Sequence, residues 1–273
     1  YGCVLLPPVT PDADFGILFM HNEGWSTMCG HGIIAVVKVL IQTGLIAATK
    51  ESTEINIDTP AGRVTAWAQM KDKKIQSIAF RNVPSFVCIK NETVDVPQVG
   101  TIELDIAFGG AFYAFVDAGQ LDVKLEPQYF RELIHQGMAI KRKVMQTFEI
   151  SHPDDADLNF VYGTIFTGPS PNPSVNSRHV CVFANGQVDR SPTGTGVSGR
   201  MALHYADGQI QMGERLTIDS IIGTTFSGSI QSVVNAGPYE AVVPEIQGTA
   251  FITGTHDFMV DPNDTVHRGF VLR

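Results

Sequence analysis

The chain has 273 residues, of which 44% are hydrophobic and 17% are charged, and its formal net charge at pH 7 is −9. This is the composition of a globular protein with one or two domains and a substantial core. The negative charge argues against a nucleic-acid-binding protein, which usually presents a basic face. No run of eighteen apolar residues occurs, so no membrane-spanning helix is expected.

The first residues, YGCVLLPPVTPD, contain no basic segment and their apolar run is broken by two prolines, so we do not expect a signal peptide. The sequence does not begin with Met, from which we expect that an upstream segment has been lost or removed. The cysteines are far apart and form no C-x-x-C pair, and we expect reduced thiols in a cytoplasmic protein. They are Cys3, Cys29, Cys88 and Cys181.

Most of the chain is expected to form short strands. Residues 51–69 alternate apolar and polar side chains around a turn at 60–62, which predicts a β-hairpin. Seven further strands are predicted, at 101–108, 111–118, 179–184, 215–222, 226–234, 239–246 and 249–260. Three helices are expected among them: an amphipathic one over 127–147, and two that follow Cys29 and Thr193.

The last two helices resemble each other. CGHGIIAVVKVLIQTG (29–44) and TGTGVSGRMALHYADG (193–208) align at an offset of 164 residues, with glycines at three matching positions. Each helix pattern stops at a glycine, which suits the left-handed position after a helix. The repeat predicts two similar lobes.

Gly194, Gly196 and Gly199 match the G-x-G-x-x-G fingerprint of dinucleotide-binding loops. That interpretation requires a strand leading directly into the first glycine, whereas NGQVDRSPT separates Gly194 from the preceding strand. We expect Ser191 to be the N-cap of the second helix, with Pro192 at its first position. Two helix starts facing each other would bind a small anionic or zwitterionic molecule through their free N–H groups.

Cys29 opens the first helix and is followed two positions later by His31. Both features favour the thiolate, so Cys29 is a candidate nucleophile or base. The alternatives are a buried, inert thiol and a Cys-x-His metal site, and the second lacks further ligands at a useful spacing.

HNEGWSTMCGHG (21–32) and DRSPTGTG (189–196) resemble the two active-site signatures of the proline racemase family. This family comprises racemases, hydroxyproline epimerases and trans-3-hydroxy-L-proline dehydratases. Further matching stretches are DFGILFMHNEG, GGAFYAFVDA, VCVFANGQVDRSP and GTAFITGTHDFMVDP, which together extend over nearly all of the chain. The family's N-terminal opening segment is missing, so Tyr1 is expected to correspond to a point inside a typical member.

The resemblance implies an α+β, two-lobed, diaminopimelate-epimerase-like fold, with a β-barrel-like sheet around a central helix in each lobe. We expect residues 1–105 and 247–273 in the first lobe and 106–246 in the second. The substrate, a small imino acid, would lie between the two helix starts. The resemblance also implies a homodimer and a reaction that needs neither metal nor cofactor.

In racemases and epimerases of this family each lobe supplies one cysteine. Here Cys29 matches the first and Thr193 replaces the second. Because a threonine hydroxyl is a poor acid–base group near neutral pH, two-base racemisation is disfavoured. The Cys/Thr pair resembles the branch that dehydrates trans-3-hydroxy-L-proline to Δ1-pyrroline-2-carboxylate. A racemase, an epimerase and a truncated, non-catalytic member are the alternatives.

By the same resemblance, Cys29 would remove the Cα proton and Thr193 would hydrogen-bond the 3-hydroxyl or the departing water. His31 would support the thiolate or contact the substrate, and Asp189 would pair with the ring ammonium. The backbone N–H groups expected to hold the carboxylate belong to Gly30, Gly194 and Thr195.

Overall fold

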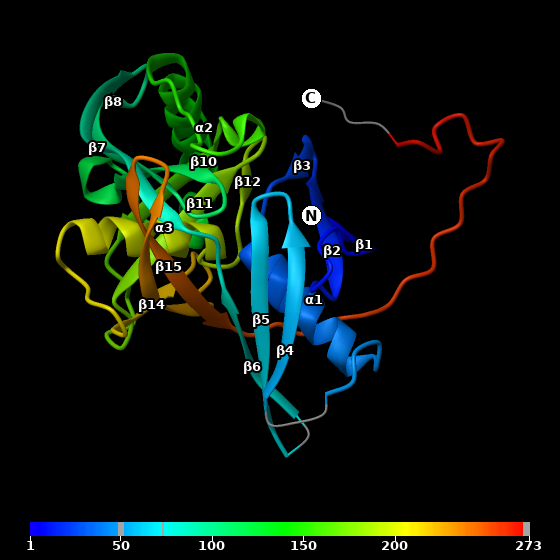
Figure 1. Cartoon of the computed structure of the whole chain (residues 1–273). Helices are drawn as coiled ribbons and strands as arrows, with labels where there is room; N and C mark the ends of the chain where they lie inside the picture. Colours follow the sequence, from blue (N-terminus) through cyan, green and yellow to red (C-terminus); the bar gives the residue numbers. More distant parts are fainter. Residues whose placement is uncertain (49–51, 73, 270–273) are drawn as a thin grey trace.

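The computed structural model describes residues 1–48, 52–72 and 74–269. Its strands form one strongly curved sheet that passes through both halves of the molecule (Figure 1). The sheet wraps two buried helices whose N-terminal ends meet at the centre. These helices are α1 (Gly30–Gln42) and α3 (Gly194–Ala206).

In the first half, strands in the order β1-β2-β4-β5-β6 curve over α1, and β3 pairs with β2. Their bounds are β1 (Gly2–Leu6), β2 (Phe15–His21), β3 (Gly24–Ser26), β4 (Ser52–Thr59), β5 (Gly62–Lys71) and β6 (Lys74–Arg81). The alternating pattern of β4 and β5 buries every second side chain, as in Ile55 and Ala66, against the apolar face of α1. The predicted hairpin is confirmed, although its first residue, 51, lies outside the described residues.

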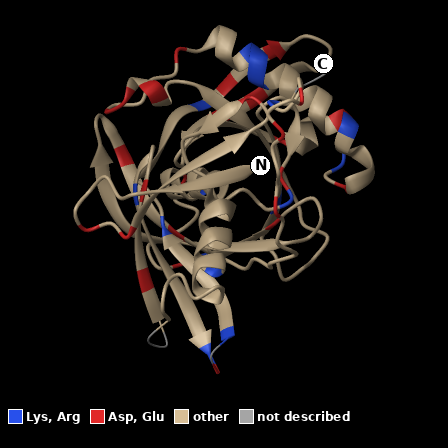
Figure 2. Cartoon of the chain, turned by 90° about the vertical axis from the view of Figure 1, so that its right-hand side faces the viewer, with Lys and Arg blue, Asp and Glu red and all other residues tan. Residues whose placement is uncertain are grey.

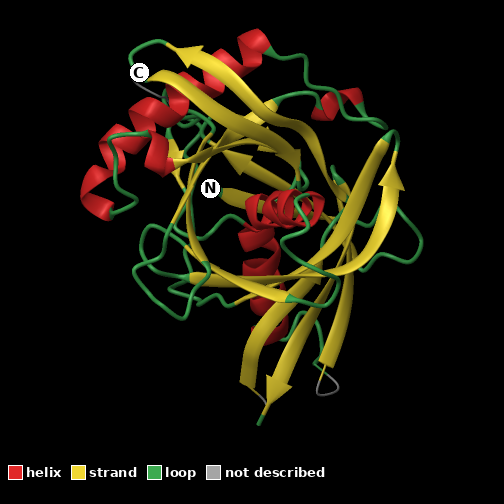
Figure 3. Ribbon diagram, turned by 90° about the vertical axis from the view of Figure 1, so that its left-hand side faces the viewer, coloured by secondary structure: helices red, strands yellow, loops and turns green. Residues whose placement is uncertain are grey.

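In the second half, eight strands close into a barrel in the order β7-β8-β9-β10-β11-β13-β14-β15, because β15 also pairs with β7. Their bounds are β7 (Ser85–Val96), β8 (Gly100–Phe108), β9 (Phe112–Asp117), β10 (Val161–Gly168), β11 (Ser177–Phe183), β13 (Arg215–Asp219), β14 (Thr225–Ala236) and β15 (Tyr239–Gly248). Helix α3 lies inside this ring and contacts β7, β8, β14 and β15 (Figure 3). The short strand β12 (Gln187–Val188) pairs with β11 and leads toward α3.

The amphipathic helix expected over 127–147 is confirmed as a 3₁₀ turn, η2 (Pro127–Tyr129), followed by α2 (Phe130–Thr147). Its buried residues fall at helical spacing and cover β10 and β11 from outside the barrel. They are Leu133, Gly137, Ile140 and Val144. Two more 3₁₀ turns are η1 (Ala118–Gln120) and η3 (Ala156–Leu158).

The two halves share a continuous sheet because β6 pairs with β15, with Phe80 opposite Ile246. Strands β7 and β8 pair with each other, and β8 pairs with β9. Their buried side chains belong to the same hydrophobic core as those of α2. The expected lobe boundaries, 1–105 with 247–273 and 106–246, stay a prediction.

The predicted strand at 249–260 is wrong. These residues run away from the sheet without regular structure, and Phe251, Phe258 and Met259 are exposed (Figure 1). The alternating pattern alone does not make a strand, since a strand needs a partner for its backbone and a surface for its apolar face. Conversely, seven observed strands were not predicted: β1, β2, β3, β6, β7, β10 and β12. Strand β10 is buried almost throughout and therefore shows no alternation.

Lys and Arg are scattered among Asp and Glu on the face shown in Figure 2. Among the described helices, none is long and apolar enough to cross a bilayer.

Candidate active site

Cys29 is the N-cap of α1. Its backbone is extended (φ −144°, ψ 105°) and its Sγ accepts a hydrogen bond from the N–H of Gly32 at 3.3 Å. The thiol thus replaces the oxygen that usually occupies this position. Its side chain lies at the positive end of the helix dipole, where negative charge is favoured. Helix α1 ends at Gln42 with Thr43 as its C-cap, and the following Gly44 has a φ of 78°, which matches the predicted left-handed position.

Thr193 is the N-cap of α3, and its φ of 67° is in the left-handed region that an L-residue rarely adopts. Such a conformation costs about 1–3 kcal/mol and is typical of functional sites. The expectation that Ser191 is the N-cap is wrong. Its hydroxyl instead accepts from the Thr193 N–H at 3.1 Å, which forms a local turn before the helix.

The two helix starts touch through their first glycines. A Cβ added to Gly30 would lie 2.7 Å from the Cα of Gly194, and one added to Gly194 would lie 2.8 Å from the Cα of Gly30. The ring of Phe80 closes the same space from the sheet. Only glycine at both positions permits this approach, so the starts of both helices, with their free N–H groups, lie side by side.

His31 and Asp189 join the two halves across the pocket. The Nδ1 of His31 lies 3.1 Å from Oδ2 of Asp189 and 3.3 Å from the Oγ of Ser191. Asp189 also accepts from the Ser191 N–H at 2.8 Å and from the Thr193 hydroxyl at 2.9 Å. The carboxylate therefore organises the whole turn that precedes α3.

The pKa values of this pair favour its charged form. Burial disfavours the imidazolium, but the negative charges of Cys29 and Asp189 outweigh it and hold the pKa of His31 well above its usual value. Burial likewise acts to raise the pKa of Asp189, but the charge and hydrogen bond of His31 hold it below the usual value. The result is an imidazolium–carboxylate pair near neutral pH.

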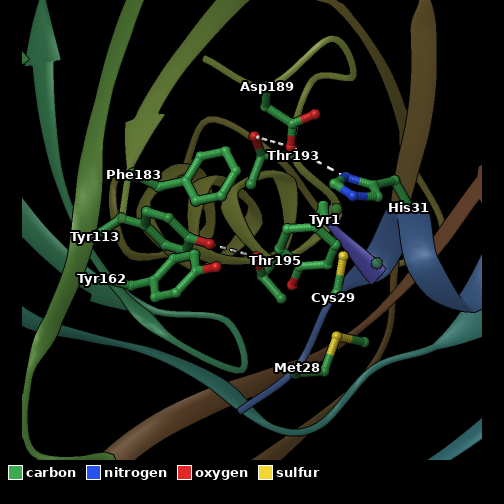
Figure 4. A pocket seen from close by; sticks show the side chains of 12 residues that line it. Tyr1, Met28, Cys29, His31, Tyr113, Tyr162, Phe183, Asp189, Thr193 and Thr195 are labelled. Atoms are coloured by element: carbon green, nitrogen blue, oxygen red, sulfur yellow. Dashed lines mark hydrogen bonds and ion pairs between the residues drawn. The ribbon is translucent and has the colours of Figure 1, made fainter. Parts of the chain in front are cut away.

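The helix starts open into a pocket (Figure 4). Its remaining wall is largely aromatic and comes from β9, β10 and β11. The hydroxyl of Tyr113 is 2.8 Å from that of Thr195, and Tyr162 stacks on Phe183 with ring centroids 5.5 Å apart. The ring of Tyr1 lies edge-on to that of His31, with ring centroids 5.2 Å apart. The lining thus combines polar groups at the two helix starts with an aromatic wall.

All seven residues selected from the sequence line this one pocket: Cys29, Gly30, His31, Asp189, Thr193, Gly194 and Thr195. Sequence reasoning missed the other lining residues, which are Tyr1, Met28, Tyr113, Tyr162 and Phe183. The aromatic residues among them come from apolar stretches in which nothing local separates a pocket residue from a core residue. Within the described residues, no group of three or more His, Cys, Asp or Glu side chains is placed to hold a metal ion.

Comparison with known proteins agrees with this geometry. The proline racemase family model matches residues 1–271. The trans-3-hydroxy-L-proline dehydratase of Colwellia psychrerythraea is 44% identical over 274 residues, which is 100% of this chain and 77% of that protein. The 3-hydroxyproline 2-epimerase of Burkholderia multivorans is 38% identical over 273 residues, which is 100% of this chain and 82% of that protein.

The crystal structure of a hydroxyproline epimerase from Agrobacterium vitis, with bound trans-4-hydroxy-L-proline, superposes with a TM-score of 0.93. It is 32% identical, and the match covers 99% of this chain and 77% of that one. The chain therefore belongs to the proline racemase family of enzymes, and the α+β, diaminopimelate-epimerase-like fold implied by the sequence is confirmed.

Proposed function

We propose that this protein dehydrates trans-3-hydroxy-L-proline to Δ1-pyrroline-2-carboxylate without a cofactor. The observation that carries the proposal is the unequal pair at the two helix starts: a thiol at Cys29 and a hydroxyl at Thr193. A reaction with one proton abstraction and one departing group needs only one such base. The names of relatives at 44–45% identity support the same reaction.

The substrate carboxylate would bind between the helices. The first N–H groups of each helix have no partner within the helix, and the Gly30–Gly194 contact brings the two sets together. We assign this role to the N–H groups of Gly30, Gly194 and Thr195. The same donors would stabilise the enolate-like charge that develops when the Cα proton leaves.

Cys29 would act as the base that removes this proton. Its thiolate would be stabilised by the start of α1 and by the imidazolium of His31. Asp189 would pair with the ring ammonium as well as with His31, since a carboxylate has about four acceptor positions and the structure shows three donors on Asp189. Keeping the ring nitrogen charged acidifies the Cα–H bond.

Thr193 is not equipped to be a second base. Its hydroxyl donates a hydrogen bond to Asp189, and a threonine hydroxyl releases its proton only far above neutral pH. We therefore assign it to holding Asp189. The expected contact between Thr193 and the 3-hydroxyl stays a prediction. The family resemblance likewise supports a cytoplasmic homodimer, to be tested by fractionation and by light scattering.

Proton NMR with three imino acids tests the function. Dehydration of trans-3-hydroxy-L-proline is expected, with pyrroline-2-carboxylate as product, while L-proline and trans-4-hydroxy-L-proline should give no inverted product. Inversion of either of the latter would support the racemase or epimerase alternative, which has its own support in the name of the Burkholderia relative. A folded sample inactive on all three would refute the proposal and favour a non-catalytic protein.

A further inference from the structure

Asn82 lies in the short segment between β6 and β7, where the chain passes from the first half into the barrel. The residue is buried, with 3% of its surface exposed, and it does not line the pocket. Its Nδ2 donates two hydrogen bonds, to the carbonyl oxygen of Gly109 at 2.7 Å and to the hydroxyl of Ser198 at 2.8 Å. Since a carbonyl oxygen can only accept, the atom beside Gly109 is the amide nitrogen. The side chain of Asn82 therefore ties a turn of the barrel to helix α3.

The bond to Ser198 continues to the first residue of α3. The Ser198 hydroxyl donates to the carbonyl oxygen of Gly194 at 2.9 Å while it accepts from Asn82. The same oxygen of Ser198 can do both, because a hydroxyl has one donor and two acceptor positions. Asn82 thus reaches the first turn of α3 through two hydrogen bonds, and this turn carries the N–H groups that we assign to the substrate carboxylate.

The bond to Gly109 holds a two-glycine turn that connects β8 to β9 and lies against both helix starts. A Cβ on Gly109 would overlap the carbonyl oxygen of Thr195, and a Cβ on Gly110 would lie 3.1 Å from the Cβ of Met28. The hydroxyl of Thr27 donates to the carbonyl oxygen of Gly110 at 2.8 Å. Met28 and Thr195 both line the pocket (Figure 4). The glycine turn is therefore packed between the residues that precede α1 and the first turn of α3.

We propose that Asn82 is a positioning residue that sets the Cys29 thiolate against the N–H groups of α3, an assignment that rests on the dehydratase function proposed above. Cys29 directly follows Met28, whereas the proposed carboxylate donors Gly194 and Thr195 belong to the other helix. Proton removal requires the base and these donors to engage one substrate molecule together, and an error approaching 1 Å costs on the order of 10²-fold in rate. Asn82 controls this geometry through Ser198 and the glycine turn, and it does not touch the substrate.

Asn82→Ala removes both hydrogen bonds. Its kcat for dehydration of trans-3-hydroxy-L-proline should fall about 10²-fold, while KM stays within a few-fold of normal, because the carboxylate donors remain but are no longer aligned with the base. With substrate deuterated at Cα, the isotope effect on kcat should be at least as large as in the unmodified enzyme, since proton removal is the step that is slowed. A role confined to folding would lower Tm and leave kcat, KM and the isotope effect of the folded enzyme unchanged.

Ser198→Ala and Thr27→Val each remove one contact and disturb the fold less, so they carry the test if Asn82→Ala does not fold. Ser198→Ala should lower kcat about 10-fold with little change in KM, because the bond from Asn82 to the glycine turn remains. The double variant should lie within about twofold of Asn82→Ala alone, since both changes interrupt one path. Thr27→Val frees the other end of the glycine turn and should lower kcat in the same way.

Thr164→Val is the matched control. Its buried hydroxyl donates to the carbonyl oxygen of Gly137 at 2.9 Å, between β10 and α2, and neither residue lines the pocket. The change removes a buried hydrogen bond to a glycine carbonyl, as Asn82→Ala does, but away from the helix starts. It should lower Tm while kcat stays within about twofold of normal, because the base and the carboxylate donors are not displaced.

Three results overturn the assignment: kcat within a few-fold of normal in both Asn82→Ala and Ser198→Ala, a loss confined to KM, or a smaller isotope effect, which would place the slowed step elsewhere. An unmodified enzyme that leaves trans-3-hydroxy-L-proline unchanged would be a different failure. It would refute the dehydratase function itself, and with it this role of Asn82.

Discussion

Gly30→Ala tests whether the meeting of the two helix starts builds the site. The added Cβ would lie 2.7 Å from the Cα of Gly194 and 2.9 Å from the tip of Phe80. Ordinary contact begins at 3.4 Å, so the helices must separate by about 0.7 Å. Backbone atoms cannot rotate away as a side chain can. We expect a loss of about 1–3 kcal/mol in the free energy of unfolding, reduced by up to ~1 kcal/mol through the better helix propensity of alanine.

The effect on activity should be larger than the effect on stability. A displacement approaching 1 Å at a catalytic site costs on the order of 10²-fold in rate, and here it would separate the N–H groups that hold the carboxylate. The assays are thermal unfolding, in which each kcal/mol shifts Tm by about 2–4 °C, and kcat/KM for dehydration.

Gly199→Ala is the control within α3. Its Cβ would be tight only against the side chain of Phe115, at 3.1 Å and 3.3 Å, and would lie at ordinary contact distance, 3.6 Å, from the Cβ of Ala107. Neither residue lines the pocket. It should leave kcat/KM within about twofold of normal, because a displacement of a few tenths of an ångström in a side chain does not reach the helix starts. Full activity in Gly30→Ala would refute the inference that close helix approach forms the binding site.

Three further predictions concern the charged and catalytic groups. Cys29→Ser should abolish dehydration while circular dichroism shows an intact fold, since the hydroxyl is a far weaker base; retained turnover would exclude Cys29 as the base. Thr193→Cys should introduce Cα exchange or inversion of L-proline, measured by NMR in D2O, since it restores a thiol at the second helix start. If the variant shows neither exchange nor inversion, the facing arrangement of the two residues is contradicted. The third concerns His31→Gln, which should lower Tm most near pH 5–6. The pKa of His31 is raised, so its contribution is complete below its ordinary pKa of 6.5 and is lost as the pH rises through the raised value. The pKa of Asp189 is lowered, so its contribution is present above 3.8 and is lost as the pH falls through the lowered value. A Tm difference that does not change between pH 5 and pH 10 would argue against a charged pair.

The candidate site was largely accessible from the sequence because its chemistry depends on local features. A cysteine and a threonine, each directly before a Gly-x-Gly helix start and separated by 164 residues, identify both ends of the pocket. Asp189 lies four residues before Thr193, and it was selected because DRSPTGTG (189–196) resembles the second signature of the family. The sequence-based expectations for these residues required no knowledge of how distant strands pair.

The sequence-based predictions were wrong or incomplete where the structure depends on contacts that the local sequence does not show. The left-handed conformation of Thr193 depends on Asp189 and Ser191 together, and it moved the N-cap two residues beyond the predicted position. The alternation at 249–260 had no partner strand in the described structure. Tyr162 comes from an apolar strand, and only the barrel, which stacks its ring on Phe183, brings it into the pocket lining.

The most direct test of the central claim, a single working base opposite a threonine, is chiral analysis of trans-3-hydroxy-L-proline during turnover by the unmodified enzyme. One base predicts pyrroline-2-carboxylate as the product, and residual substrate that keeps its L configuration throughout the reaction. Accumulation of cis-3-hydroxy-D-proline, the epimer at Cα, would contradict the account, because it requires a second proton donor on the Thr193 side.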